Sequence, residues 1–206
     1  MSNAIKIYSF PLSGHSHRVI LFASIAGIAH EVINLDLANG EHKKETYLAI
    51  NPAGQVPAIV DGENAISDSN AILVYLARKY APSFLPDDLL SEVEIQKYLS
   101  LAAGEIAFGP AAARLINVFN AGLDPEFARQ TSSKVLTKLN AALKDKDYLV
   151  GNSPTIADIA IYSYVAHAPE GGISLEEYPN VRHLLSNIES LSGFVPMQST
   201  KVGLVK

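Results

Sequence analysis

A short segment near the start of the chain gathers hydroxyl and imidazole groups at a turn. Pro11-Leu12-Ser13-Gly14-His15-Ser16-His17-Arg18 follows a β-rich stretch and opens a helical pattern. Ser13 or Ser16 can be the N-cap of that helix, which is the ordinary role of a serine there. The same place also suits an anion, because a helix N-terminus presents free N–H groups and a positive dipole end. A serine hydroxyl here can therefore donate to a bound thiolate.

Two other segments carry groups suited to the charged ends of a ligand. A charge run such as 40–45 usually covers a solvated helix face, but its His42 and Lys43 could hold a carboxylate. The segment 67–72 opens another helix, and a Ser or Asp at that position is normally a cap. A ligand carboxylate could occupy this helix start instead, with Asp68 holding an ammonium group.

The segment 51–57 offers backbone groups. An ordinary trans proline at the start of a strand is the simplest interpretation of Pro57. A cis Val56–Pro57 bond would instead turn the N–H and C=O of Val56 outward, where they could pair with a peptide. Together the four segments suit a thiolate, a carboxylate, a peptide unit and an α-amino acid end. A tripeptide with one thiol, one amine and two carboxylates carries all of these groups.

The first 80 residues must position these segments, and their pattern is that of an α/β domain. The expected order is strand 5–8, helix 18–26, strand 30–35, short helix 41–49, hairpin strands 57–60 and 65–66, and helix 69–80. A strand, helix and strand in about thirty residues predict a βαβ unit with parallel strands. Asp61-Gly62 favours the hairpin turn. This order of strands and helices predicts a four-stranded mixed sheet.

The composition changes after residue 80. Two prolines in 81–86 indicate a linker, and the rest reads as helices over 88–120, 124–145, 155–167 and 178–191. Thr155 and Asp158 have the spacing of a reciprocal helix cap, a structural role. The expected organisation is therefore an α/β domain over 1–80, a linker over 81–86 and an all-helical domain over 87–206.

Composition excludes several classes of function. The 206 residues contain no Cys, which removes disulfides, thiolate metal sites and Cys nucleophiles, so a reactive thiol must arrive on a ligand. A net charge of −5 without a basic stripe argues against nucleic acid as a partner. His15 and His17 are two residues apart and do not share a helix face, so no metal site is expected. Neither a signal peptide nor a bilayer-spanning run is evident, which predicts a cytoplasmic protein with no membrane partner.

The chain resembles the glutathione transferase family over essentially its whole length, most strongly over residues 5–80. The serine two positions after the first proline is similar to that of serine-type members, namely the phi class and related bacterial forms. The resemblance implies an N-terminal thioredoxin-like domain with a C-terminal helical bundle, a cytoplasmic homodimer, and conjugation of glutathione to small hydrophobic electrophiles in detoxification. Glutathione is then a co-substrate, and no metal is needed.

The resemblance also assigns roles to residues. Ser13 would stabilise the thiolate, His42 and Lys43 would meet the glycine end of glutathione, and a cis Pro57 would be expected. Gln55 and Val56 would contact the γ-glutamyl and cysteinyl parts, and Asp68-Ser69 would hold the γ-glutamyl end. Three positions depart from the pattern common in the family. Ala53 stands where a Phe is common, Asp68 where a Glu is common, and Gly14 where a Ser, Thr or Ile is common. These departures leave the class open, with Ser16 or Tyr8 as rival thiol partners.

The electrophile is expected between Leu12 and the first helices of the second domain. The candidate lining residues at helical spacing are Phe108, Ala112, Leu115 and Phe119, although each also suits an ordinary core position. Arg114 could meet a polar substrate. Two alternatives remain: a glutathione-dependent peroxidase or isomerase on the same scaffold, or a non-catalytic binding or regulatory protein.

Overall fold

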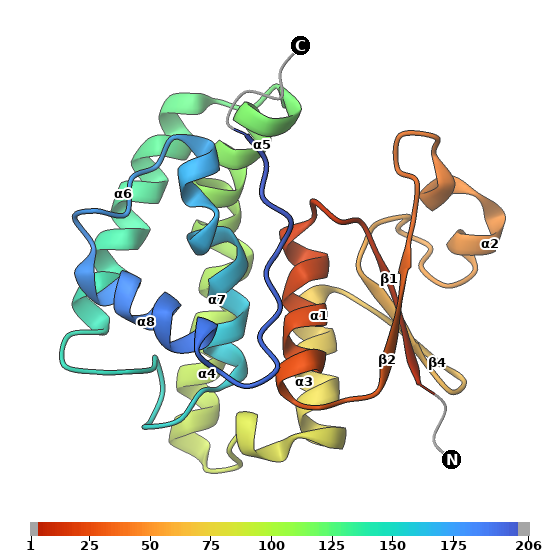
Figure 1. Ribbon diagram of the computed structural model, residues 1–206, viewed down its shortest axis with the longest axis horizontal. Helices are drawn as coiled ribbons and strands as arrows, with labels where there is room; N and C mark the ends of the chain where they lie inside the picture. Colours follow the sequence, from red (N-terminus) through yellow and green to blue (C-terminus); the bar gives the residue numbers. More distant parts are fainter. Residues whose placement is uncertain (1–3, 202–206) are drawn as a thin grey trace. The chain divides into compact units, whose positions relative to one another are not determined.

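The protein is described here by a computed structural model that covers residues 4–201 (Figure 1). It forms two compact units. The first contains the residues up to Pro82 together with Ser192–Gln198, and the second contains Ser83–Leu191 and the residues from Ser199 onward. The junction at Pro82 falls inside the expected linker. The return of Ser192–Gln198 to the first unit differs from the expected division, which placed these residues in the helical domain.

The first unit is built on a four-stranded mixed sheet, as predicted. Its elements in order are β1 (Ile5–Ser9), α1 (Gly14–Ile25), β2 (His30–Asn34), the 3₁₀ turn η1 (Glu41–Lys43), α2 (Glu45–Leu48), β3 (Ala58–Asp61), β4 (Asn64–Ser67), α3 (Ser69–Tyr80) and the 3₁₀ turn η2 (Pro82–Phe84), which begins at the junction. The strand order is β2-β1-β3-β4. β1 and β2 are parallel, which confirms the βαβ unit, and the other two pairings are antiparallel.

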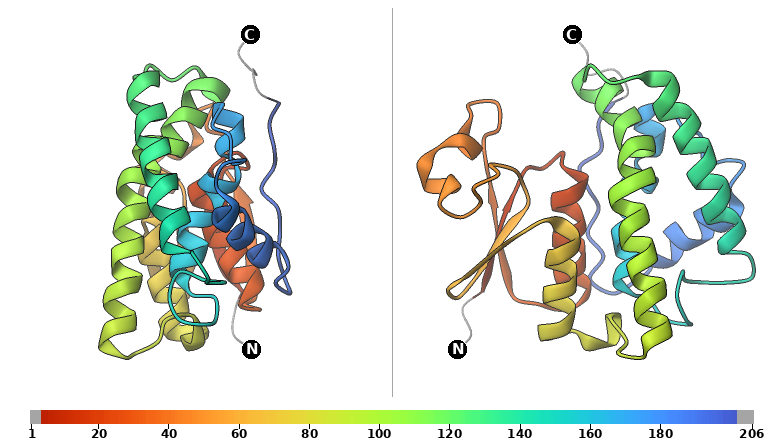
Figure 2. Two further views of the ribbon diagram at one scale, coloured as in Figure 1. Left: turned by 90° about the vertical axis from the view of Figure 1, so that its left-hand side faces the viewer. Right: turned by 180° about the vertical axis from the view of Figure 1, so that it is seen from behind.

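Both faces of the sheet are covered. In Figures 1 and 2, α1 and α3 lie side by side on one face and α2 lies on the other. Phe22 of α1 and Leu73 of α3 are fully buried with the inward side chains of β1 and β3. On the α2 side, Leu35, Tyr47 and Ala58 form a second apolar cluster. The sheet therefore holds the starts of α1 and α3 in fixed places at its edge.

The second unit is all helical, as predicted. Its elements are α4 (Leu89–Leu101), the π-helix η3 (Ala102–Ala111), α5 (Ala112–Phe119), α6 (Pro125–Ala142), α7 (Ile156–Ala166), the 3₁₀ turn η4 (Ala168–Gly171) and α8 (Pro179–Glu189). The helix expected over 88–120 is thus interrupted by a ten-residue π segment. Pro110 lies inside that segment and cannot donate a backbone hydrogen bond, which breaks the regular α-helical ladder.

The helix α7 runs through the core of the second unit. Thr155 and Asp158 form the predicted capping box at its start, and both residues are buried.

The helical run Leu89–Phe119, which comprises α4, η3 and α5, is long and apolar enough to cross a membrane, but half of its most apolar stretch is buried inside the protein. Such partial burial is typical of a core helix in a bundle.

The segment Ser192–Gln198 packs on α1. Ser24 Oγ donates to the carbonyl of Gly193 at 2.6 Å, and His17 Nε2 lies 2.8 Å from the carbonyl oxygen of Val195. A Cβ on Gly193 would lie 2.6 Å from the carbonyl oxygen of Ser24, so only glycine fits this approach. These contacts explain why Ser192–Gln198 belongs to the first unit.

Candidate functional site

A cavity of about 290 Å³ opens in the first unit where α1, the loop before β3 and the start of α3 meet. Its lining residues are His15, Asn51, Ala53, Gln55, Val56, Pro57, Ser67, Asp68 and Ser69. Five of the eight residues predicted to hold or activate glutathione are therefore brought together: Gln55, Val56, Pro57, Asp68 and Ser69. The other three, Ser13, His42 and Lys43, do not line this cavity.

The loop before β3 presents a rigid backbone to the cavity. The Val56–Pro57 peptide bond is cis, as the resemblance implies. The carbonyl of Gln55 accepts hydrogen bonds from Tyr47 Oη at 2.5 Å and from Asn51 Nδ2 at 2.7 Å. Tyr47 and Asn51 are both buried, so this double anchor fixes the Gln55 carbonyl, and Asn51 also lines the cavity.

The start of α3 supplies a carboxylate at the cavity wall. Asp68 is the N-cap, and its Oδ1 accepts from the backbone N–H groups of Asn70 and Ala71 at 3.0 and 2.9 Å. Asp68, rather than Ser67 or Ser69, is therefore the cap of α3. Asp68 also has a φ of +68°, a conformation that non-glycine residues rarely adopt and that commonly marks functional sites. Its side chain remains exposed.

A buried polar network joins the starts of α1 and α3. Arg18 Nη1 donates to Ser69 Oγ at 2.8 Å and to Asn70 Oδ1 at 2.7 Å, and His15 Nδ1 lies 3.2 Å from the same Ser69 oxygen. Burial, reinforced by the charge of Arg18 and opposed by that of Asp68, lowers the pKa of His15 to about 4. The imidazole is therefore neutral at pH 7.

His15 lines the cavity, whereas its place in the sequence suggested only a metal ligand, and its spacing from His17 argued against that role. Its position in the first turn of α1, two residues after Ser13, placed it near the expected thiol site. Its contact with Ser69 joins residues 54 positions apart, so only the folded sheet reveals it. Asn51, Ala53 and Ser67 complete the lining and also lacked a predicted role in binding.

Ser13 is the N-cap of α1, and its Oγ accepts from the backbone N–H of Ser16 at 3.2 Å. Of the two rival thiol partners, Ser16 is fully buried, and its Oγ accepts from the backbone N–H of Phe10 at 3.4 Å. Tyr8 lies in β1 with its ring 5.6 Å from that of Tyr47. Ser13 is thus the more accessible hydroxyl of this turn.

The residues predicted for the glycine end lie beside the loop that contains Pro57. Lys43 Nζ donates to the carbonyl of Gly54 at 3.0 Å. Gly54 has a φ of +57°, and a Cβ on it would lie 2.9 Å from the carbonyl oxygen of His42. Within the described residues, His42 Nδ1 is buried without a hydrogen-bond partner. The turn η1 therefore packs directly against the loop that precedes β3.

The residues predicted for the electrophile pocket have unequal environments. Phe108, Leu115 and Phe119 have 60%, 36% and 41% of their surface exposed, whereas Ala112 is buried against Ala113 and Ala128. Ala112 is thus a core residue of the second unit. Leu12 is half-buried in the first unit.

The suggestion that Arg114 meets a polar substrate is wrong. Its side chain is buried, and Nε donates to Glu170 Oε2 at 2.6 Å. Thr200 and His167 also contact the Glu170 carboxylate, each at 2.7 Å. Burial opposes the ionised form of Glu170, but these hydrogen bonds outweigh it and lower its pKa to about 2. Arg114 therefore has a structural carboxylate partner.

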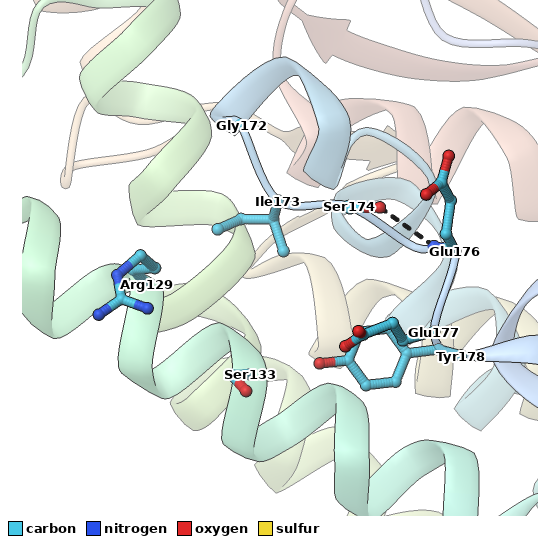
Figure 3. A pocket seen from close by; sticks show the side chains of 8 residues that line it. All are labelled: Arg129, Ser133, Gly172, Ile173, Ser174, Glu176, Glu177 and Tyr178. Carbon is cyan, nitrogen blue, oxygen red and sulfur yellow. Dashed lines mark hydrogen bonds between the residues drawn. The ribbon is translucent and has the colours of Figure 1, made fainter.

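Two other hollows lack the predicted groups. One of about 380 Å³ lies in the second unit between α6 and the loop 172–178, and its lining includes Arg129, Ser133 and Tyr178 (Figure 3). Arg129 is already paired with Glu126 at 2.6 Å. Another, of about 260 Å³, lies in the first unit against 195–198 and is lined mainly by apolar side chains. Among the described residues, no group of three or more His, Cys, Asp or Glu side chains could hold a metal.

Comparison with known proteins identifies the family. Residues 3–78 match the glutathione S-transferase N-terminal domain and residues 122–192 match the C-terminal domain. Glutathione S-transferase F10 of Arabidopsis thaliana is 31% identical over 76% of this chain and 77% of its own length.

Two crystal structures extend the match to the fold. A glutathione S-transferase from Pseudomonas fluorescens superposes with a TM-score of 0.88 at 28% identity, covering 96% of this chain and all of the other. A glutathione transferase homologue from Drosophila mojavensis with bound glutathione has a TM-score of 0.83 at 26% identity, covering 93% of this chain and 89% of the other. The chain belongs to the glutathione S-transferase family.

Proposed function

We propose that the protein conjugates glutathione to small hydrophobic electrophiles, with glutathione bound in the cavity at the starts of α1 and α3. The observation that carries the proposal is the convergence of Gln55, Val56, Pro57, Asp68 and Ser69 on that one cavity. The relative that holds glutathione in its crystal structure supports the choice of ligand.

Each end of the tripeptide has a counterpart in the first unit. Asp68 at the exposed start of α3 supplies a negative charge for the ammonium group of the γ-glutamyl residue, and Ser69 supplies a hydroxyl for its carboxylate. Val56 presents backbone groups for the cysteinyl unit next to the cis proline. His42 and Lys43 are assigned to the glycine carboxylate, since η1 packs on the same loop.

Ser13 can cap its helix and stabilise the thiolate at once. A hydroxyl has one O–H and two lone pairs. The cap uses one lone pair of Ser13 to accept from Ser16, which leaves the O–H to donate to sulfur. A free thiol has a pKa of about 8.5, and lowering it by about two units requires about 2.7 kcal/mol. A hydrogen bond to a charged group contributes about 1.5–3 kcal/mol and the helix dipole about 0.3–1 kcal/mol.

The chemical step follows from a bound thiolate. The thiol proton leaves to solvent on ionisation, and the sulfur lone pair forms a new bond to an electrophilic carbon. The leaving group departs with the electrons of its former bond to that carbon. The first unit supplies the thiolate, and the second is assigned the electrophile, with Phe108, Leu115 and Phe119 as its exposed apolar groups. The protein is proposed to act in the cytoplasm, in detoxification, as a homodimer.

Retention on immobilised glutathione followed by turnover of a chromogenic aryl halide tests the proposal. We expect retention that free glutathione reverses, and conjugate formation that depends on both substrates. Retention without turnover of the aryl halide, hydroperoxides or isomerisable substrates would indicate the non-catalytic alternative. Turnover of hydroperoxides alone would indicate a peroxidase. A protein that does not bind glutathione at all would contradict the assignment of the cavity.

A further inference from the structure

One hydroxyl group lies where the starts of α1 and α3 meet. Ser69 has only 4% of its surface exposed, yet it lines the glutathione cavity. Its oxygen is 2.8 Å from Arg18 Nη1 and 3.2 Å from His15 Nδ1. Because a guanidinium group has donors and no acceptor, Ser69 must accept from Arg18. One of the two lone pairs on the Ser69 oxygen is thus already committed.

The direction of the Ser69 O–H then depends on His15. A neutral imidazole carries its proton on one of its two nitrogens. If Nδ1 carries the proton, it donates to Ser69, both lone pairs are occupied, and the O–H is left to point into the cavity. If Nδ1 is bare, Ser69 donates to it and has no O–H to offer a ligand. An anionic ligand group at Ser69 therefore requires the Nδ1–H form of His15.

We propose that His15 is a positioning residue that selects the α-carboxylate of the γ-glutamyl group. His15 and Arg18 together hold Ser69 as a donor toward that carboxylate, while Asp68 takes the neighbouring ammonium group. The pair of sites distinguishes an α-amino acid end from a simple acid or amine. This inference rests on the proposed binding of glutathione and adds to it a residue and a direction of hydrogen bonding.

The fall in the pKa of His15 supports the neutral form that this arrangement needs. The charged groups facing the ring are Arg18 on α1, which disfavours protonation, and Asp68 at the start of α3, which favours it. Burial has the largest effect on the pKa of His15 and acts in the same direction as Arg18, so the ring is neutral at pH 7. A neutral ring donates through one nitrogen only, and in the complex we assign that nitrogen as Nδ1.

Two substitutions separate the hydrogen bond from the bulk of the side chain. In His15→Asn the amide nitrogen takes the place of Nδ1, whereas His15→Leu keeps a side chain of similar bulk that has no hydrogen-bond donor. Since one hydrogen bond is at stake, we expect His15→Leu to weaken glutathione binding about fivefold to tenfold and His15→Asn to stay close to the wild type. Titration calorimetry measures both, and equal affinities of all three proteins would overturn the role of His15.

Two glutathione analogues identify the group that His15 serves. The γ-aminobutyryl analogue lacks the α-carboxylate, and the glutaryl analogue lacks the amine. The loss caused by His15→Leu should persist with the glutaryl analogue and disappear with the γ-aminobutyryl analogue. An equal loss with both analogues would overturn the proposal, because it would indicate a general structural effect.

A double-mutant cycle with Ser69→Ala tests whether His15 acts through Ser69. The effects of His15→Leu and Ser69→Ala should be strongly non-additive, since His15 acts on the ligand only through the Ser69 hydroxyl, which Ser69→Ala removes. Additive effects would overturn the route through Ser69. Nitrogen-15 NMR of the glutathione complex should show Nδ1 protonated, and an Nε2–H ring would contradict the proposal. If the wild type itself fails to bind glutathione, the proposed function fails before the role of His15 is reached.

Discussion

Individual residues at the start of α1 serve the fold and the chemistry with different atoms. Ser13 accepts a helix-capping hydrogen bond from Ser16, and its O–H is not consumed by that role. Arg18 is buried, yet its guanidinium reaches the cavity wall through Ser69. A substitution here can therefore alter stability and catalysis together, and the variants must be chosen to separate the two.

Ser13→Gly removes the hydroxyl with little loss of capping, because glycine at an N-cap costs only a few tenths of a kcal/mol relative to serine. We expect the pKa of bound glutathione to rise by about one to two units and kcat to fall about tenfold or more, with glutathione affinity nearly unchanged. Ultraviolet thiolate absorbance against pH and steady-state kinetics measure these effects. Ser13→Thr keeps the hydroxyl and is the control. Unchanged thiolate absorbance in the glycine variant would exclude Ser13 as the thiol partner.

His15 predicts a pH dependence of stability in the free protein. Its pKa is about 4 in the folded state against 6.5 for an unperturbed histidine, so between these values the unfolded chain binds the proton more readily. Stability should therefore fall as the pH drops from 6.5 toward 4, by on the order of 2–3 kcal/mol from this residue. His15→Asn should flatten that part of the curve in urea unfolding. Parallel curves for the two proteins would contradict the shift.

At the scale of elements, the start of α7 is fixed by a buried carboxylate. Asp158 accepts from the backbone N–H groups of Leu149 and Thr155, each at 2.8 Å, as well as from the Thr155 hydroxyl. Its removal leaves buried donors without partners, which costs about 1–3 kcal/mol for each. The cap therefore joins the loop at Leu149 to the core helix.

Asp158→Ala should lower the free energy of unfolding by about 3–5 kcal/mol, while the thiolate pKa of bound glutathione stays unchanged. Chemical denaturation and thiolate absorbance provide the two readouts. Asp158→Asn keeps one acceptor oxygen and should lose less stability. A change in the thiolate pKa of glutathione bound to the fully folded Asp158→Ala variant would show that Asp158 has a role beyond the cap.

The elements were predictable where local pattern determines them. Alternation and Asp61-Gly62 predicted the hairpin of β3 and β4, and the spacing of Thr155 and Asp158 predicted the cap of α7. The π segment was missed because the periodicity of apolar residues does not reveal how Pro110 changes the backbone hydrogen bonds of a helix. The role of His15 and the pairing of Arg114 with Glu170 were missed for another reason. Both depend on contacts between residues far apart in the chain.

At the scale of the whole molecule, an exposed apolar patch is relevant to the homodimer that the family resemblance implies. Leu89, Leu90 and Val93 in the first turns of α4 have 73%, 78% and 55% of their surface exposed. Apolar groups gathered in this way commonly mark an interaction surface.

Leu90→Glu should shift the protein from dimer toward monomer, because a buried unpaired carboxylate opposes association. Sedimentation velocity should give twice the chain mass for the wild type and a lower weight-average mass for the variant. Phe127→Glu alters an exposed apolar side chain on α6 and serves as the control. A variant that sediments as the wild type does would place the dimer interface elsewhere.

The return of Ser192–Gln198 to the first unit interleaves the two units along the chain, because the helical unit contains Ser83–Leu191 and resumes at Ser199. During synthesis the N-terminal residues leave the ribosome first and domains generally fold as units. Here, however, the first unit lacks its packing on Ser24 and His17 until residues 193–195 have emerged. The glutathione-binding unit is therefore begun first but completed only after the helices of the second unit have been synthesised, and a nascent chain stalled before Gly193 carries that unit without its final segment.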